Sequence, residues 1–347
     1  MGAHVNVGIS GLGRIGRFHA INLAQHIPLA KLMRIVDANE DLARTVSEQL
    51  GGIPWSTDYR DLLHDPAIEA VVIATPTPLH VEMIEAAAAA GKHIFCEKPI
   101  SLDLESTYRA IDAVSKANVS LQVGFHRRFD PDYRNARERI VSDEIGQIYL
   151  FRTSVRDMRA PSFDFIKGSG GLFIDFTLHD FDATRWLIGE IEEITAVGAV
   201  LSDPDFERGG HIDNAIITLR FVGGALGVID NSLVAGYGYE CSSEIMGSKA
   251  TLHIGNHRRT SVEVLTAGGI YHDQVSDFVE RFGTAYRAEM ESFVYAVYSK
   301  KRPDVGGADA AAAFVLARAA QRSHHEKKSV KLSHIIQNGE ILYQEIH

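Results

Sequence analysis

The sequence predicts an α/β protein with two domains: a doubly wound parallel sheet, then an α/β domain on an open-faced, mostly antiparallel sheet. Short apolar runs alternate with helical periods from Gly16 to about Gly124, the pattern of a parallel sheet with helices on both faces. Beyond Gly124, strand-like runs are separated by glycine turns, which indicates hairpins. The length of 347 residues allows two domains, which we place at residues 1–124 and 125–347.

The chain begins with a strand that leads into a glycine turn. Val5 to Ile9 is a β-branched run, and Gly11, Gly13 and Gly16 follow it with the spacing G-x-G-x-x-G, just before the helical pattern Ile15 to Leu23. Such glycines allow a tight turn, close approach of a pyrophosphate and close packing of helix on strand. Three glycines can also serve a simple bend. The position between a strand and a helix favours a dinucleotide site.

A second apolar run, Leu32 to Val36, ends in Asp37. This aspartate lies about 20 residues beyond the last glycine, where a dinucleotide site places the acid that binds the adenosine ribose hydroxyls. Aspartate after a strand is often only a turn residue. We favour NAD over NADP, because Asp37 would repel a 2′-phosphate and residues 38–41 contain no Arg or Lys to receive one.

The rest of the first domain supplies further loops at strand ends. The expected strands are Val71–Ala74, His93–Cys96 and Leu121–Val123. The expected helices are Leu79–Ala90 and Leu104–Ala117. Ligands of open parallel sheets bind outside the carboxyl ends of the strands, so the loops Gly11 to Gly16, Thr75 to His80 and Glu97 to Pro99 should converge there. Thr75 and Pro76 could contact the cofactor, although prolines also simply terminate strands.

The second domain is expected to hold an antiparallel sheet flanked by helices. Its predicted strands are Ile148–Val155, Glu193–Val200, Ala215–Phe221, Leu226–Leu233, Glu240–Met246 and Ala250–Ile254. Its predicted helices are Asp132–Val141, Asp175–Leu187, Arg287–Tyr298 and Ala308–His325. An apolar outer face on such a sheet must be covered, and oligomerisation would cover it.

Composition excludes several classes of protein. The net charge of −10 and the lack of a basic stripe argue against nucleic-acid binding. The two cysteines, Cys96 and Cys241, form no C-x-x-C pair, which favours a reducing compartment and argues against structural zinc. No apolar run reaches membrane-spanning length and no secretory signal pattern is present, so we expect a cytoplasmic protein with no membrane partner.

Three side chains have the chemistry for alcohol oxidation. Asp175 and His179 are four residues apart, and on a helix their Cβ atoms would lie about 5–6 Å apart on one face. Histidine can accept a hydroxyl proton near neutral pH, although a lone helical histidine is usually structural. Lys98 follows an apolar strand and precedes a proline, a position that faces the ligand crevice. Asp180 and Asp182 make a metal site imaginable, but other ligands are lacking and we expect no metal.

These motifs resemble the Gfo/Idh/MocA oxidoreductases, and most closely the inositol 2-dehydrogenases among them. The resemblance runs along the whole chain. It is carried by GLGRIG at the N-terminus, C-E-K-P at Cys96 to Pro99, VGFHRRFD at Val123 to Asp130, GGLFIDFTLHDFD at Gly170 to Asp182, and YGYE with EIMGSKA between Tyr237 and Ala250. The glycine loop alone is unspecific, whereas E-K-P together with D-x-x-x-H-D at this separation is a strong match.

The resemblance implies an NAD-binding Rossmann domain and a substrate-binding domain whose open sheet builds dimers and tetramers. It also implies that His179 is the acid/base, that Asp175 orients the substrate and tunes that histidine, and that Lys98 holds the reacting hydroxyl. Arg127, Asp157 and Tyr239 match positions that line a polyol pocket, and Arg281 and Tyr286 resemble a cofactor-adjacent segment. The predicted cofactor-binding residues are Gly11, Gly13, Arg14, Ile15, Gly16, Asp37, Ala38, Thr75, Pro76, His80, Glu97 and Lys98.

The leading hypothesis is therefore NAD-dependent oxidation of a secondary hydroxyl of a cyclic polyol, myo- or scyllo-inositol, to the ketone. A dehydrogenase acting on a pyranose sugar is an alternative, because a ring of hydroxyls looks similar in both substrates. A dinucleotide-binding regulatory protein without catalysis is an alternative of another class. The presence of Lys98, Asp175 and His179 together favours an enzyme.

Overall fold

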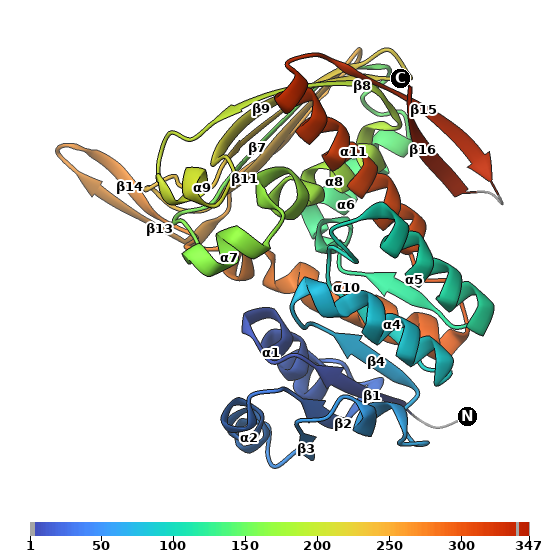
Figure 1. Cartoon of the computed structure of the whole chain (residues 1–347). Helices are drawn as coiled ribbons and strands as arrows, with labels where there is room; N and C mark the ends of the chain where they lie inside the picture. Colours follow the sequence, from blue (N-terminus) through green and yellow to red (C-terminus); the bar gives the residue numbers. More distant parts are fainter. Residues whose placement is uncertain (1–3, 338–339, 347) are drawn as a thin grey trace. The chain divides into compact units, whose positions relative to one another are not determined.

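The computed structural model describes residues 4–337 and 340–346 (Figure 1). The chain forms two compact units. The first consists of Met1–Phe129 with Thr284–Ala311, and the second of Asp130–Gly283 with Ala312–His347. The sequence-based division into residues 1–124 and 125–347 did not anticipate that the chain returns to the first unit at Thr284–Ala311.

The first unit contains a six-stranded, fully parallel sheet with the strand order β3-β2-β1-β4-β5-β6. Its strands are β1 (Val5–Ser10), β2 (Ala30–Val36), β3 (Trp55–Ser56), β4 (Ala70–Ile73), β5 (His93–Cys96) and β6 (Leu121–Val123). The order reverses between β1 and β4, which is the point where doubly wound folds bind their ligands. The predicted parallel sheet is thus confirmed.

Helices connect these strands. They are α1 (Arg14–Ile21), the π-helical turn η1 (Asn22–His26), α2 (Glu40–Gln49), α3 (Arg60–Leu63), the 3-10 turn η2 (Thr77–Leu79), α4 (His80–Ala89) and α5 (Leu104–Ala117). The apolar face of β1 is fully buried at Val7 and Ile9. Burying each such side chain stabilises the fold by about 1.5–3 kcal/mol.

Helix α10 (Phe278–Ser299) also belongs in large part to this core. Met290, Phe293, Val294 and Val297 pack in the same hydrophobic cluster as β1. The sequence-based assignment of Arg287–Tyr298 to the second domain was therefore wrong, because a local apolar pattern does not say against which sheet a helix packs. Phe282 has non-helical dihedral angles, so α10 consists of two helices joined at a kink.

The second unit contains an eight-stranded mixed sheet with the order β12-β11-β7-β10-β9-β8-β15-β16. Its strands are β7 (Ile148–Arg156), β8 (Ile191–Ala199), β9 (Asn214–Phe221), β10 (Leu226–Ser232), β11 (Glu240–Gly247), β12 (Thr251–Ile254), β15 (Val330–Gln337) and β16 (Glu340–Ile346). The predicted hairpins β9–β10 and β11–β12 are antiparallel. One pair, β7 with β10, is parallel. The last two strands were not predicted.

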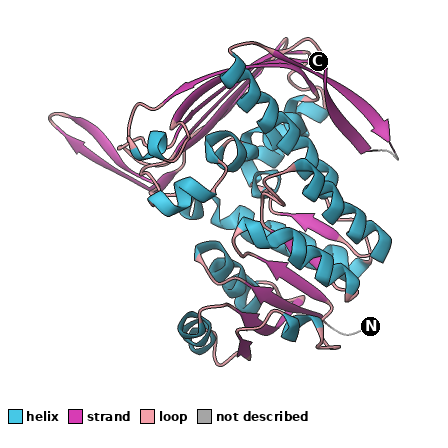
Figure 2. Cartoon of the chain, in the orientation of Figure 1, coloured by secondary structure: helices cyan, strands magenta, loops and turns pink. Residues whose placement is uncertain are grey.

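The helices of this unit lie against one face of the sheet (Figures 1 and 2). Helix α8 (Leu178–Ile188) contacts β7, and α6 (Pro131–Val141) contacts α8. Helix α11 (Gly307–Glu326) runs along the same side. The shorter helical elements are the 3-10 turn η3 (His126–Phe129) of the first unit, and α7 (Phe163–Gly168), the π-helical turn η4 (Leu172–Phe176) and α9 (Asp205–Arg208) of the second.

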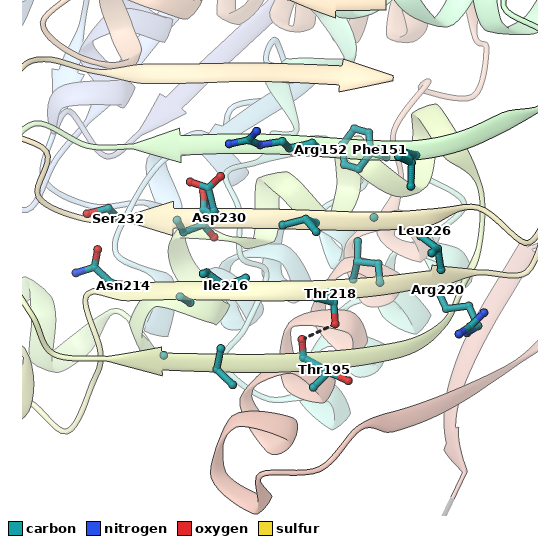
Figure 3. Close-up of a pocket in the computed structure, with 18 of the residues that line it drawn as sticks. Phe151, Arg152, Thr195, Asn214, Ile216, Thr218, Arg220, Leu226, Asp230 and Ser232 are labelled. Carbon is teal, nitrogen blue, oxygen red and sulfur yellow. Dashed lines mark hydrogen bonds between the residues drawn. The ribbon is translucent and has the colours of Figure 1, made fainter. Parts of the chain in front are cut away.

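The opposite face of the sheet is open and partly apolar. Along β9, buried residues alternate with exposed ones, and Ile216 on the open face is 53% exposed. Val197 and Leu226, which lie on the neighbouring strands, are 61% and 45% exposed. Figure 3 shows this face, with Ile216, Thr218 and Arg220 along β9. The predicted open-faced sheet is confirmed.

A two-stranded hairpin, β13 (Arg258–Thr266) and β14 (Gly269–Gln274), forms a sheet of its own. All residues of β13 are exposed. Its apolar side chains include Val264 and Leu265, and Ile270 on β14 is 64% exposed. This hairpin was not predicted from the sequence. Within the described part of the chain, no helix combines the length and the apolar character needed to cross a membrane.

Candidate functional site

The glycine turn has the geometry of a phosphate-binding loop. Gly11 has a φ of +91°, and a Cβ atom there would lie 2.5 Å from the backbone of Ala74. A Cβ atom at Gly16 would lie 1.8 Å from the carbonyl oxygen of Gly11, so helix α1 packs directly on the turn. A Cβ atom at Gly13 would have no described heavy atom within 4 Å. The backbone is therefore open at Gly13, where α1 begins and its N–H groups attract anions.

The Asp37 carboxylate is bonded to this turn. Its Oδ2 accepts a hydrogen bond from the backbone N–H of Leu12 at 2.7 Å, and its Oδ1 accepts one from Asn39 at 2.8 Å. A carboxylate has about four lone-pair sites, so both oxygens can still accept hydroxyl groups. Ala38 beside it is exposed. The residues present fit an adenosine ribose next to the turn.

The three predicted loops converge as expected. The turn at Gly11 lies against the backbone of Ala74 and Thr75. The ring of His80, at the start of α4, has Nε2 2.7 Å from the carbonyl oxygen of Thr75 and Nδ1 2.8 Å from that of Pro99. His80 is 1% exposed, so it joins two of the loops to each other. Its role as a cofactor contact remains a prediction.

Burial lowers the pKa of His80 below its ordinary value, against the opposing effect of the two carbonyl oxygens. A neutral imidazole carries one N–H and can donate to only one of them. The other contact then sets a lone pair against a carbonyl oxygen. The ring is thus held neutral by desolvation and positioned by the backbone on both sides.

Lys98 lies directly after β5, where it is partly exposed, and the Lys98–Pro99 peptide bond is cis. Its neighbour Glu97 is held by His19 of α1, whose Nε2 lies 2.7 Å from Glu97 Oε1. Arg127, in η3, is 3% exposed. The nearby His126 ring stacks on the ring of Tyr286, with centroids 4.3 Å apart.

In the second unit, Asp175 and His179 do not lie on one continuous α-helix as expected. Asp175 belongs to the π-helical turn η4, closed by a hydrogen bond of 2.9 Å from the Thr177 N–H to the Leu172 carbonyl oxygen. His179 lies in the first turn of α8. Such π-helical insertions occur frequently at functional sites. Both side chains are partly exposed, whereas Thr177 and Asp180 between and beside them are fully buried.

A buried network fixes this segment, and the sequence did not reveal it. The Thr177 hydroxyl donates to Asn231 Oδ1 at 2.7 Å, and Asn231 Nδ2 donates to Asp180 Oδ2 at 3.0 Å. Asn231 lies near the end of β10. Its only signal was an amide side chain between Asp230 and Ser232, at the polar end of the strand. Asp180, considered above as a metal ligand, thus serves this network.

Asp157 lies just beyond β7, beside the end of its parallel neighbour β10. Its backbone N–H donates to the Ser232 carbonyl oxygen at 2.9 Å. Tyr239 precedes β11 and is 4% exposed, with its ring edge-on to Phe282. Arg281 is paired with Asp130 at 2.8 Å, and both side chains are 1% exposed. In this unit Arg281 therefore serves a buried ion pair.

Comparisons with known proteins agree with this geometry. Residues 5–125 match the oxidoreductase family with an NAD-binding Rossmann fold, designated GFO_IDH_MocA, and residues 137–332 match its C-terminal α/β domain. The chain is 41% identical to a myo-inositol 2-dehydrogenase of Thermotoga maritima over 96% of this chain and 100% of that protein. It is 40% identical to an NAD(+) scyllo-inositol 2-dehydrogenase of Bacillus subtilis, over 94% and 96%.

Among solved structures, the chain resembles scyllo-inositol dehydrogenase from Lactobacillus casei with bound NAD(H) and scyllo-inositol. The TM-score is 0.89 at 31% identity, and the match covers 94% of this chain and 99% of that one.

Proposed function

Because the chain belongs to the Gfo/Idh/MocA oxidoreductase family, we propose that it is an NAD-dependent inositol 2-dehydrogenase. It oxidises a secondary hydroxyl of a cyclic polyol, myo- or scyllo-inositol, to the ketone. The observation that carries the proposal is the near full-length identity of about 40% to dehydrogenases of both inositols. The same chain also presents a glycine turn with an open backbone and an aspartate, Asp37, that is hydrogen-bonded to it.

The cofactor would be held by the first unit. The open backbone at Gly13 and the N-terminus of α1 receive the pyrophosphate, and Asp37 receives the ribose hydroxyls. The other proposed cofactor contacts are Gly11, Arg14, Ile15, Gly16, Ala38, Thr75, Pro76, His80, Glu97 and Lys98. Bound NAD supplies a hydride acceptor for the carbinol carbon. The negative charge of Asp37 disfavours the 2′-phosphate of NADP.

The chain's own residues would handle the hydroxyl proton. Lys98 holds the reacting hydroxyl and favours the alkoxide through its positive charge. His179 accepts the proton as general base, and Asp175 orients the substrate and favours the charged imidazole. Arg127, Asp157 and Tyr239 are proposed to bind the remaining hydroxyls. A polyol requires several such fixed donors and acceptors.

We further propose that the protein is a homo-oligomer, a dimer or tetramer, assembled through the open face of the eight-stranded sheet. This face forms a hollow of about 1210 Å³ lined by Leu150, Val197, Ile216, Leu226 and other residues (Figure 3). Paired charges such as Arg220 and Glu193, 3.8 Å apart, lie among them. A two-fold axis would place this apolar face against the same face of a second copy of the chain.

We expect the protein to work in the reducing environment of the cytoplasm. Neither Cys96 nor Cys241 forms a disulfide, and both side chains are buried. Burial raises the pKa of the Cys96 thiol well above its ordinary value, which keeps this side chain unreactive. The two thiols need no oxidising compartment.

The test is reduction of NAD by the purified protein with myo-inositol, scyllo-inositol, D-chiro-inositol, glucose, galactose and xylose, with NADP in parallel. Turnover of an inositol with NAD is the expected result. Activity confined to the aldoses would favour a pyranose dehydrogenase instead. No turnover on any substrate, with NAD binding confirmed by fluorescence titration, would favour a non-catalytic role.

A further inference from the structure

A cluster of three titratable side chains, two of them fully buried, includes the residue that precedes Lys98 in the first unit. His19 of α1, Glu97 after β5 and Glu289 of α10 each offer a nitrogen or oxygen atom, and these atoms all lie within 4.8 Å of one another. His19 and Glu289 are 0% exposed. Three segments far apart in the sequence therefore meet at the residue that precedes Lys98.

The two carboxyl groups of the cluster have unequal surroundings. Glu97 Oε1 contacts His19 Nε2 at 2.7 Å, and its side chain keeps 14% exposure. Neither carboxyl oxygen of Glu289 has a hydrogen-bond partner among the described residues. Two carboxylates this close in a buried space cannot both be charged without a strong penalty, so a proton resides on the less solvated one. Burial, and then the charge of Glu97, raise the pKa of Glu289 well above its ordinary value.

A metal ion is the other way to neutralise such a cluster. Two ligands of one tetrahedral zinc ion, each about 2.0–2.1 Å from it, would lie about 3.3 Å apart. The separation of 2.7 Å between His19 Nε2 and Glu97 Oε1 is instead that of a hydrogen bond. The geometry favours a shared proton over a bound cation.

We propose that Glu289 is held as a neutral carboxylic acid and that, together with His19, it positions the Glu97 carboxylate and thereby the backbone that carries Lys98. A small rotation of Glu289, or one bridging water, can connect its carboxyl group to the Glu97 carboxylate. Glu289 is then a positioning residue, because it acts through Glu97.

Glu97 is fixed on its other sides as well. Its backbone N–H donates to the Ile73 carbonyl oxygen at 2.9 Å. Its Oε2 lies 2.8 Å from where a Cβ atom would stand at Gly124. The carboxylate thus occupies space that Gly124 leaves free, and a shift of Glu289 is transmitted to Glu97 because little room remains.

The other polar groups around Glu289 are consistent with a neutral acid. Gln122 of β6 donates through Nε2 to the Glu289 backbone carbonyl at 2.7 Å, and not to the carboxyl group. One helical turn away, the Tyr286 ring lies edge-on to His19 and stacked on His126.

The first measurement is the infrared spectrum at neutral pH of the full-length protein and of Glu289→Gln. A neutral carboxylic acid has a C=O stretch well separated from that of a carboxylate. We expect this band in the unmutated protein, its loss in Glu289→Gln and its retention in Glu291→Gln, an exposed glutamate of the same helix. Identical spectra for the unmutated protein and Glu289→Gln would overturn the proposal. This measurement does not depend on the proposed function.

The second measurement rests on the proposed function and compares Glu289→Leu with Glu289→Gln. We expect Glu289→Leu to lower kcat about ten- to hundredfold, as small misplacements of catalytic groups do, with far less change in the KM for NAD. Glu289→Gln, which keeps the shape and an N–H donor, should restore most of this loss. A Glu289→Gln variant as slow as Glu289→Leu would mean that a charged carboxylate is required. A divalent ion bound one-to-one and lost in Glu289→Gln would assign the cluster to a metal.

Discussion

The Asp37 carboxylate accepts a hydrogen bond from the backbone N–H of Leu12 at 2.7 Å, which ties the end of β2 to the glycine turn after β1. Asp37, which we propose to bind the ribose, therefore also positions the glycine turn that we propose to bind the pyrophosphate. Binding and folding are coupled at this position.

Replacing Asp37 by alanine should weaken NAD binding and also destabilise the first unit. A hydrogen bond to a charged group contributes about 1.5–3 kcal/mol, so the KM for NAD should rise roughly ten- to hundredfold and the preference over NADP should relax. The free energy of unfolding should fall by about 1–3 kcal/mol, because the Leu12 and Asn39 N–H groups lose their acceptor.

Asp41→Ala is the matched control, because Asp41 is 82% exposed and pairs only at the surface with Arg44. Its KM for NAD and its stability should stay close to those of the unmutated protein. Equal use of NAD and NADP by the unmutated protein would refute the role of Asp37 in cofactor choice.

Replacing Lys98 by alanine should abolish turnover and preserve NAD binding. The lysine is proposed to hold the reacting hydroxyl, and loss of such a group lowers kcat by about 10²–10⁴. NAD affinity is measured by fluorescence titration and turnover by NADH formation with inositol. Lys116→Ala, on the surface of α5 with a 76% exposed side chain, is the control. Unchanged turnover in Lys98→Ala would remove the lysine from the mechanism.

Local sequence patterns were sufficient for most of the first unit. Buried parallel strands read as continuous apolar runs, and helices α4 and α5 have apolar periods with clear ends. At β13 the patterns failed because the strand lacks alternation. All residues of β13 are exposed, so no buried face marks that strand in the sequence.

Some residues of the candidate site could likewise be identified from the sequence, and others could not. Motif residues such as Lys98 and His179 were found because their chemistry is unusual at their positions. Asn231 and Glu289 were missed, since each lies among other polar residues of its strand or helix and acquires meaning only from its partners in space. The π-helical turn at Asp175 was missed because one inserted residue leaves no local signature.

The burial of His80 predicts a loss of stability in acid. Its pKa is lowered in the folded protein, so below about pH 6.5 the unfolded chain binds a proton that the folded chain does not. The free energy of unfolding should then fall as the pH drops, by at most about 1.4 kcal/mol per pH unit from this residue. Above that pH both states are neutral and His80 contributes no pH dependence.

His80→Gln removes this titration and should show a smaller loss of stability between pH 7.5 and pH 5.5, measured by urea unfolding at both pH values. Burial also lowers the pKa of His93, His211 and His324, so part of the acid sensitivity should remain in the variant. The same pH dependence in the variant and the unmutated protein would show that His80 does not titrate differently on folding.

Assembly through the open face of the eight-stranded sheet predicts that a charge placed on that face dissociates the oligomer. Ile216 lies on this face between Val197 of β8 and Asp230 of β10, its neighbours in the strand register. Ile216→Lys would place an ammonium group in an apolar interface, twice across a two-fold axis, and desolvation of that charge costs several kcal/mol even beside Asp230. The dissociation constant should rise about a hundredfold or more, measured by light scattering across a concentration series.

Val141→Lys, on the 68% exposed Val141 of α6, should leave the mass unchanged. A monomeric unmutated protein, or an unchanged mass for Ile216→Lys, would mean that this face is not the interface.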